Sequence, residues 1–183
     1  MKTQTIPVKK TFLNPEQLLR LIPVEPGLIV ADFGCGNGYY AVAAGVITGK
    51  TGQIFAIDIL EDALSQTATL AKLVGTPNVS TKQCNLENFG ACPIAETSCD
   101  LVIMASLLHQ VKNKDNLLRE AYRVLKTGGK ILVVEWQATG PFGPPVSDRV
   151  SEDGTQKLLE KFSFRPLKKL PAGSFHYALL YQK

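Results

Sequence analysis

Three glycines at alternate positions follow a short apolar segment near the start of the chain. They are Gly34, Gly36 and Gly38. The apolar segment, residues 28–33, is typical of a strand, and a helix-compatible run begins at Tyr39. Glycine at such a strand–turn–helix junction lets the backbone approach a ligand where a Cβ would block the turn or the ligand. The spacing therefore predicts a ligand at the end of the first strand.

Two carboxylates near this turn narrow the choice of ligand. Asp32 lies two places before the first glycine, where an acid suits a ligand with a cationic group. Asp58 ends a second strand-like segment, residues 53–58, and could accept hydrogen bonds from both ribose hydroxyls of an adenosine. The Gly-x-Gly-x-Gly spacing differs from the dinucleotide pattern, Gly-x-Gly-x-x-Gly. These features point to S-adenosylmethionine, with its amino group and sulfonium, and disfavour a nicotinamide oxidoreductase.

Strands and helices are expected to alternate along most of the chain. A helix starts at the Asn14 cap and ends before Pro23; the other predicted helices are 39–47, 60–74, 114–125 and 151–162, and the predicted strands are 28–33, 53–58, 79–83, 101–105 and 130–136. Such alternation predicts a parallel sheet with helices on both faces.

The end of the chain breaks this alternation. Residues 165–170 and 175–181 both resemble strands, and only the turn 171–174 separates them. Two strands joined so closely must be antiparallel, because a parallel crossover needs about a dozen residues or more. We therefore expect an α/β fold with a doubly wound, mostly parallel seven-stranded sheet and a C-terminal antiparallel hairpin.

Several segments resemble one known family. Residues 32–38, Asp-Phe-Gly-Cys-Gly-Asn-Gly, look like motif I of the class I S-adenosylmethionine-dependent methyltransferases, and Ile57-Asp58 looks like their ribose-binding acid. Residues 99–105 resemble their fourth strand, and 120–134 their helix, Gly-Gly turn and fifth strand. The closest likeness is to the small type 11 domains related to ubiquinone/menaquinone-biosynthesis enzymes, roughly from Phe12 onward. The resemblance implies the Rossmann-like methyltransferase fold, with S-adenosylmethionine as methyl donor and S-adenosylhomocysteine as product.

The resemblance also implies positions for the cofactor. The glycine turn would pass under the methionine part, Asn85 and Leu86 would flank the adenine, and Ala105 would offer backbone to the amino group. The family often has Asp where Asn85 stands, but an amide oxygen can also accept a hydrogen bond from the adenine amino group. The expected cofactor residues are Asp32, Gly34, Cys35, Gly36, Asn37, Gly38, Tyr39, Asp58, Ile59, Asn85, Leu86 and Ala105.

Fewer residues are available for the methyl acceptor. Methyl transfer is an in-line displacement, so the protein mainly aligns the nucleophile and, for a hydroxyl or amine, removes a proton. The candidate catalytic residues are His176, Glu135 and His109. Either histidine could instead be structural, packed in a strand for His176 or placed in a loop for His109. Candidate substrate contacts are Trp136, Phe142 and Arg149.

A long Pro- and Gly-rich loop, residues 137–150, follows the fifth predicted strand. Loops of this length without secondary structure are commonly lids or binding loops, although an ordinary ordered connection is the alternative. The fifth strand should end where the antiparallel seventh begins. We therefore expect Glu135, Trp136, His176 and Phe142 to converge above the methyl group.

The acceptor is expected to be a small molecule. Residues 105–109 lack the Asn/Asp-Pro-Pro-aromatic motif of methyltransferases that act on planar amino groups, and they lack a Pro-Cys nucleophile. The net charge is only +4, and no basic cluster suggests a nucleic-acid partner. The alternative is a catalytically silent protein that binds S-adenosylmethionine or S-adenosylhomocysteine.

Composition sets further expectations. The 183 residues, 45% hydrophobic and 20% charged, suit one domain over 1–183, with 1–11 flexible and the protein a monomer or homodimer. The four cysteines show no Cys-x-x-Cys pair and no nearby histidine at metal spacing, so we expect no metal site and reduced thiols. The beginning of the chain has no apolar run, which predicts a cytoplasmic protein without a secretory signal or membrane span.

Overall fold

One sheet of seven strands forms the centre of the computed structural model, which describes residues 13–183. The flexible segment expected at residues 1–11 lies outside the described residues. Along the chain, the strands are β1 (Ile29–Phe33), β2 (Gln53–Asp58), β3 (Val79–Gln83), β4 (Cys99–Ala105), β5 (Leu125–Trp136), β6 (Arg165–Leu170) and β7 (His176–Gln182). Their order across the sheet is β3-β2-β1-β4-β5-β7-β6. β7 pairs antiparallel with both β5 and β6, and the other pairs are parallel. The predicted fold class is therefore confirmed.

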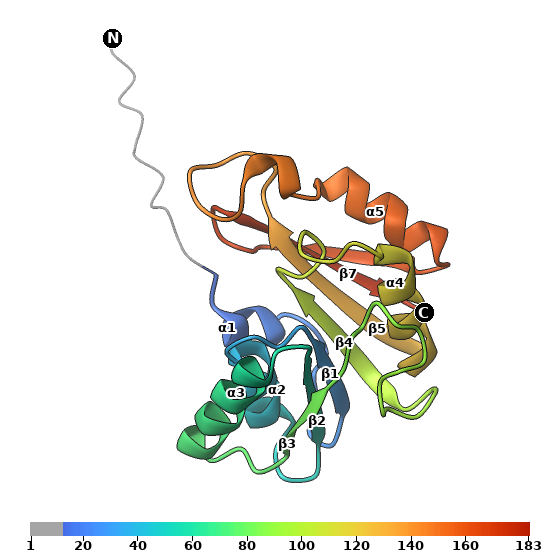
Figure 1. Cartoon of the computed structure of the whole chain (residues 1–183). Coiled ribbons are helices and arrows are strands. Elements are labelled where there is room, and N and C mark those ends of the chain that lie inside the picture. Colours follow the sequence, from blue (N-terminus) through green and yellow to red (C-terminus); the bar gives the residue numbers. More distant parts are fainter. Residues whose placement is uncertain (1–12) are drawn as a thin grey trace.

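Helices cover both faces of the sheet (Figure 1). On one face lie α1 (Pro15–Leu19), α2 (Tyr39–Thr48) and α3 (Glu61–Val74); on the other lie α4 (Lys114–Val124) and α5 (Glu152–Lys161). A short 3₁₀ turn, η1, spans Val146–Asp148. Strand side chains alternate between two apolar cores, one containing Leu18 and Leu64 and the other Leu117 and Leu159.

Side-chain caps fix where several helices begin. Asn14 Oδ1 accepts a hydrogen bond from the Gln17 amide at 3.0 Å, and Pro15 occupies the first helical position. Asn113 Oδ1 does the same for the Asn116 amide at 3.0 Å. Each cap satisfies an amide that has no partner within its helix. The helix start predicted from Asn14 is confirmed, and the helix predicted from residue 114 does begin there.

The fifth strand begins earlier than predicted. α4 ends at Val124 and β5 starts at Leu125, whereas the sequence suggested a helix to residue 125 and a strand from 130. Leu125 already pairs with Cys99, and the register then shifts before Leu101 pairs with Lys130. Pairing with β4 thus extends the strand through the Gly-Gly segment.

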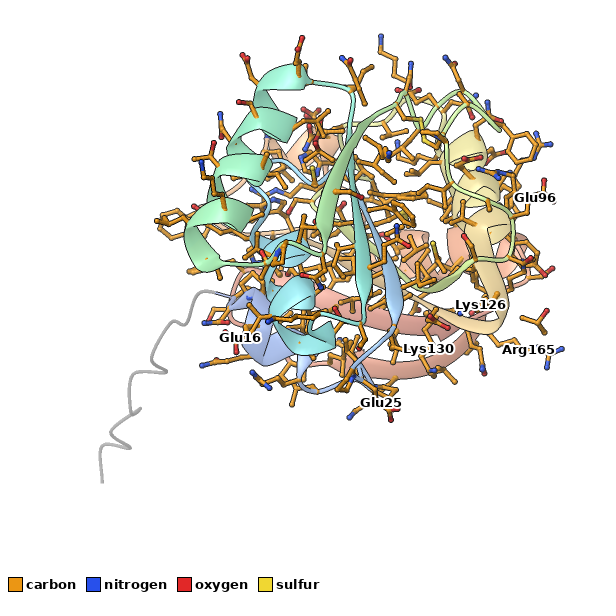
Figure 2. All side chains as sticks on the ribbon, turned by 90° about the horizontal axis from the view of Figure 1, so that it is seen from below. Glu16, Glu25, Glu96, Lys126, Lys130 and Arg165 are labelled. Atoms are coloured by element: carbon orange, nitrogen blue, oxygen red, sulfur yellow. A yellow bond between two sulfur atoms is a disulfide. The ribbon has the colours of Figure 1, made fainter. Side chains whose placement is uncertain are left out.

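The amino ends of the parallel strands carry charges of both signs. Figure 2 shows Glu25, Lys126, Lys130 and Arg165 there. Lys126 Nζ pairs with Asp100 Oδ1 at 2.7 Å. A cavity of about 240 Å³ opens on this side, but none of the expected site residues lines it. The candidate site therefore lies at the opposite edge of the sheet.

Candidate cofactor and acceptor site

The glycine turn after β1 is held against the end of β2. The Cys35 amide donates to the Ile57 carbonyl at 2.8 Å, and the Gly36 amide donates to Asp58 Oδ2 at 3.0 Å. A Cβ on Gly36 would meet no atom within 4 Å, and the residue has a φ of +50°. The backbone at Gly36 is therefore bare toward open space, where a ligand can approach it.

The neighbouring glycines are required by packing. A Cβ on Gly34 would lie 2.6 Å from Leu107 Cδ1, and one on Gly38 would lie 2.7 Å from Thr67 Oγ1. The absence of a side chain at Gly34 lets Leu107, in the loop after β4, pack against the turn. The absence of one at Gly38 lets Thr67, on α3, pack against the same turn. Of the three glycines, Gly36 is the one whose missing side chain leaves space for a ligand.

A cavity of about 420 Å³ opens beside this turn, at the carboxyl ends of the parallel strands. The expected cofactor residues that line it are Gly34, Gly36, Asn37, Asp58, Ile59, Asn85 and Leu86. It is also lined by Asp62, Gln66, Gln110 and Val111, which the sequence analysis did not single out. Asp62 and Gln66 lie one turn apart on α3, and this i, i+4 spacing just after Asp58 could have marked them.

A second cavity of about 270 Å³ shares Gly34, Gly36 and Gln110 with the first. Its walls include the expected residues Asp32, Cys35, Tyr39 and Ala105, and also Tyr40 and Ser106. The two cavities together are lined by all the residues expected at the cofactor except Gly38. The structure thus brings together residues from the ends of four strands.

Asp32 is the unusual group in the second cavity. Its side chain is 1% exposed, and Oδ2 has no hydrogen-bond partner among the described residues. Burial, above all, raises the pKa of Asp32 to about 7; the Ala41 backbone lowers it and Asp58 raises it further. A buried carboxyl without a partner favours a cationic ligand group, because an opposite charge restores the lost solvation. The amino group of S-adenosylmethionine is such a group.

Other polar atoms around Asp32 support the same fit. The Tyr40 hydroxyl is also buried without a described partner, and burial raises its pKa well above the usual range.

Burial also raises the pKa of the Cys35 thiol to about 12, so this cysteine is neutral and not a nucleophile. Ser106, directly after β4, has a φ of +54°, a conformation that a non-glycine residue keeps only under constraint from its surroundings.

Asp58, in contrast, already has partners. Its Oδ2 accepts from the Gly36 amide and its Oδ1 from the Leu60 amide, both at 3.0 Å. An ionised carboxylate has about four acceptor sites, so two amide bonds leave room for two ribose hydroxyls. The residues present therefore fit S-adenosylmethionine at both its amino and its ribose ends.

On the acceptor side, Glu135 does not lie where the sequence analysis expected. Its side chain is 1% exposed and accepts hydrogen bonds from the Leu108 amide at 2.6 Å and from His109 Nδ1 at 3.1 Å. Because strand residues alternate, Glu135 points to the face of β5 opposite Trp136. The carboxylate holds the loop after β4 through its contacts with the Leu108 amide and His109 Nδ1.

Trp136 and His176 form the other part of the acceptor side. They are direct partners across β5 and β7, and their ring centroids are 4.1 Å apart. His176 Nδ1 is buried without a described partner, and burial lowers the pKa of the ring although Glu135 raises it. His176 is therefore neutral at physiological pH and stacks on an aromatic wall.

The loop of residues 137–150 closes over this wall. The rings of Phe142 and Phe175 are 4.9 Å apart, and a Cβ on Gly143 would lie 2.5 Å from Trp136. The structure thus brings Trp136, His176 and the Phe142 loop together, and places Glu135 and His109 on the other face.

Arg149 organises the loop from within. Its guanidinium donates to the carbonyl oxygens of Pro144, Gln137 and Phe142 at 2.9, 3.0 and 2.8 Å, and to that of Gly140 at 3.4 Å. Arg149 was expected to contact the substrate, but its guanidinium N–H groups donate instead to these loop carbonyls. The position of Arg149 fits a role in holding the loop shape.

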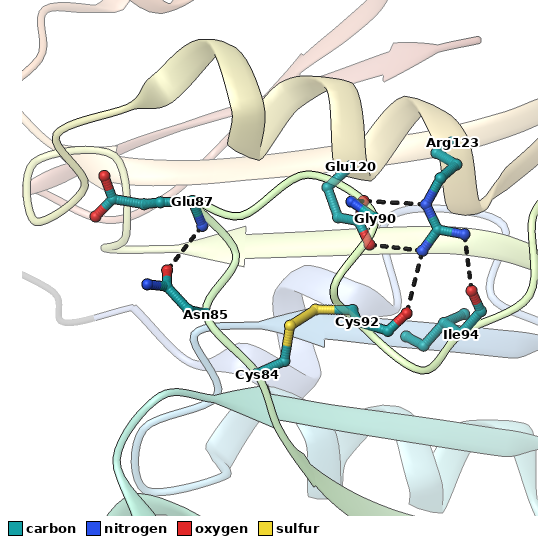
Figure 3. Close-up of a disulfide and its surroundings, with 8 residues drawn as sticks. All are labelled: Cys84, Asn85, Glu87, Gly90, Cys92, Ile94, Glu120 and Arg123. Atoms are coloured by element: carbon teal, nitrogen blue, oxygen red, sulfur yellow. Dashed lines mark hydrogen bonds and ion pairs between the residues drawn. A yellow bond between two sulfur atoms is a disulfide. The ribbon is translucent and has the colours of Figure 1, made fainter.

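The expectation of four reduced thiols is wrong for one pair. Cys84 and Cys92 form a disulfide (Figure 3), while Cys35 and Cys99 are free and buried. The Cα atoms of Cys84 and Cys92 are 5.4 Å apart, because the loop after β3 turns back on itself. This pairing has no Cys-x-x-Cys spacing in the sequence and depends on the path of that loop.

Two further observations concern metal sites and membrane-spanning helices. Among residues 13–183, no three His, Cys, Asp or Glu side chains are grouped so that they could hold a metal ion. No helix in the same range is long and apolar enough to cross a membrane.

The fold and the site define a class, the S-adenosylmethionine-dependent methyltransferases. A family model described as a methyltransferase domain matches residues 25–163. The chain therefore belongs to this methyltransferase domain family, and S-adenosylmethionine is the cofactor of its class.

Individual relatives agree with this placement. The chain is 32% identical to the ubiquinone/menaquinone biosynthesis C-methyltransferase UbiE of Haemophilus ducreyi over 148 residues, which cover 80% of this chain and 52% of the relative. It is 31% identical to the protein of the same name from Shewanella frigidimarina, over 84% of this chain and 56% of that one. The chain spans about half the length of these curated relatives. A crystal structure of a SAM dependent methyltransferase from Aquifex aeolicus shares the fold, with a TM-score of 0.86 and 23% identity over 93% of this chain and 90% of that one.

Proposed function

We propose that this protein, acting as a single domain, transfers the methyl group of S-adenosylmethionine to an uncharged small molecule. The observation that carries the proposal is the buried Asp32 Oδ2, which has no partner among the described residues, beside the bare backbone of Gly36. The cofactor supplies a methyl group on a positively charged sulfur. Asp32 binds its amino group, Asp58 its ribose, and Asn85 and Leu86 its adenine.

The acceptor is proposed to lie between the glycine turn and the aromatic wall. Trp136 and His176 form an apolar, neutral surface, and Phe142 and Val146 on the loop are largely exposed. Such a wall favours a flat, uncharged molecule. The related UbiE proteins are named as C-methyltransferases of ubiquinone and menaquinone biosynthesis, so an aromatic ring carbon of a quinone precursor is the first acceptor to test.

Where the acceptor must lose a proton, His109 is the proposed proton acceptor and Glu135 its positioning residue. Glu135 holds His109 Nδ1 and leaves Nε2 free to take a proton. Leu107 and Gln110, on either side of His109 in the chain, line the cofactor cavity, whereas His109 itself is not one of its lining residues. We assign His176 to the wall, because its ring stacks on Trp136 with the centroids 4.1 Å apart.

The cofactor assignment is tested by adding one methyl group at Gly36. Calorimetry with S-adenosylhomocysteine should show that Gly36→Ala weakens binding by about tenfold or more, because each 1.4 kcal/mol of clash costs a factor of ten. Gly75→Ala is a matched control: Gly75 also has a positive φ, of +78°, and a Cβ there would meet nothing within 4 Å. Normal binding by Gly36→Ala would overturn the assignment.

Turnover is tested with quinol and phenol acceptors, followed by mass spectrometry of the product. For a hydroxyl or carbon acid, His109→Gln should lower kcat by about 10²-fold or more. His176→Gln should change mainly KM. A protein that binds S-adenosylhomocysteine but methylates no acceptor in the panel would favour the silent binding protein.

A further inference from the structure

The Cys84–Cys92 disulfide (Figure 3) has one end, Cys84, in the wall of the proposed cofactor cavity. Cys84 lines that cavity, and its amide donates to the carbonyl of Asp58, the ribose-binding acid, at 3.0 Å. The next two residues, Asn85 and Leu86, are those proposed to flank the adenine. The position of the adenine wall therefore depends on where Cys84 is held.

The other end of the bridge is anchored to α4. The carbonyls of Cys92 and Ile94 accept hydrogen bonds from the Arg123 guanidinium at 3.3 and 2.9 Å, and the Gly90 amide donates to Glu120 Oε2 at 2.8 Å. Glu120 is fully buried and pairs with Arg123 at 2.6 Å. None of these contacts needs the disulfide, so Cys92 stays in place without it. The bridge thus ties the adenine wall to a fixed point.

The segment that it holds has no helix or strand. Residues 84–98 connect β3 to β4, and the bridge closes a ring inside this connection. Asn85 Oδ1 accepts from the Glu87 amide at 2.9 Å, and Asn116 Nδ2 donates to the Glu87 carbonyl at 2.8 Å. These bonds preserve the fold of the loop when the bridge opens. However, Cys84, Asn85 and Leu86 regain freedom that cofactor binding must then remove.

We propose that the Cys84–Cys92 disulfide controls cofactor affinity according to its redox state. The oxidised protein binds S-adenosylmethionine tightly, and the reduced protein binds it more weakly. Reduction uses an external dithiol, whose thiolate attacks one sulfur and whose second thiol closes to a cyclic disulfide. Two electrons and two protons pass to the protein, which leaves Cys84 and Cys92 as thiols. The proposal rests on the proposed cofactor cavity.

Access to the bridge should depend on the cofactor. Cys84 and Cys92 are 7% and 4% exposed, and Cys84 faces the cavity that the cofactor would fill. Bound cofactor therefore covers the route by which a small dithiol reaches Cys84. Coupling between two sites is reciprocal. If reduction weakens cofactor binding by a given factor, bound cofactor must therefore disfavour reduction of the disulfide by the same factor.

The test is calorimetry of S-adenosylhomocysteine binding to wild-type protein before and after dithiothreitol treatment. Thiol titration of the unfolded protein checks the states: Cys35 and Cys99 react in the oxidised form, and all four cysteines in the reduced form. We expect affinity to fall about five- to tenfold on reduction, at the low end of usual coupling, and to return on reoxidation. Equal affinity in the two states would overturn the proposal. Absence of binding to the oxidised protein would instead overturn the cofactor cavity.

A variant and a redox titration complete the test. Cys92→Ala removes the bridge at the residue outside the cavity, so it should bind like the reduced protein with or without dithiothreitol. Circular dichroism establishes that it folds; if it does not, the wild-type comparison alone decides. In a dithiol redox buffer, S-adenosylhomocysteine should move the reduction midpoint toward stronger reductant. An unchanged midpoint would contradict the proposal.

Discussion

Asp32 and Asp58 have the same side chain but different environments. Asp58 accepts two amide hydrogen bonds, whereas Asp32 has one oxygen buried without a described partner. Two strands that end side by side place both carboxylates around one glycine turn. The difference in partners suits Asp58 for the neutral ribose hydroxyls and Asp32 for a cationic amino group.

Replacing Asp58 should weaken cofactor binding strongly. Asp58→Ala removes two charge-assisted hydrogen bonds to the ribose and should cost about 1.5–3 kcal/mol of binding free energy. Isothermal titration with S-adenosylhomocysteine measures the loss. Asp153→Ala, at an exposed carboxylate on α5, is the control and should bind normally. Unchanged affinity in Asp58→Ala would mean that the ribose lies elsewhere.

At the scale of elements, the loop between β5 and α5 is held by one side chain. The Arg149 guanidinium donates to four loop carbonyls, and the loop in turn packs on Trp136. Carbonyl contacts of this kind give a loop one shape without regular secondary structure. Such a loop can present Phe142 to an acceptor at little further entropic cost.

Arg149→Gln should loosen this loop without changing the cofactor site. The variant loses most of these bonds, so limited proteolysis should cleave within residues 137–149 several-fold faster. Affinity for S-adenosylhomocysteine should stay within about twofold of wild type, because the loop does not line the cofactor cavity. Arg119→Gln, on the exposed side of α4, is the matched control. Equal cleavage in the two variants would show that Arg149 does not hold the loop.

At the scale of the whole molecule, Asp32 should reduce stability near neutral pH. Its pKa is raised from 3.8 to about 7 in the folded protein, so the folded state keeps a proton that the unfolded chain releases. The free energy of unfolding therefore falls as the pH rises from about 4 to 7.

Asp32→Asn should remove this pH dependence. Urea unfolding should show the variant to be more stable than wild type at pH 7.5, by on the order of a few kcal/mol, with a smaller difference at pH 4.5. The same variant should bind S-adenosylhomocysteine poorly, since the amide cannot supply the charge. A difference that does not change with pH would place the titrating group elsewhere.

The sequence by itself determined the class of fold and predicted the glycine turn as the place of the cofactor. Strand and helix periodicity, the short link before β7 and the glycine spacing are local signals, and each is read within a few residues of chain. Asp32, Gly36 and Asp58 were proposed for the site in this way, because a parallel sheet brings the carboxyl ends of its strands to one edge.

The tertiary structure alone decided which way Glu135 points, that Arg149 serves the loop, and that Cys84 pairs with Cys92. A one-residue alternation along β5 turns Glu135 toward His109 and Trp136 toward His176. The disulfide depends on the path of a loop with no periodic pattern. These features arise from contacts between segments far apart in the chain, or from irregular backbone, and neither leaves a local signal in the sequence.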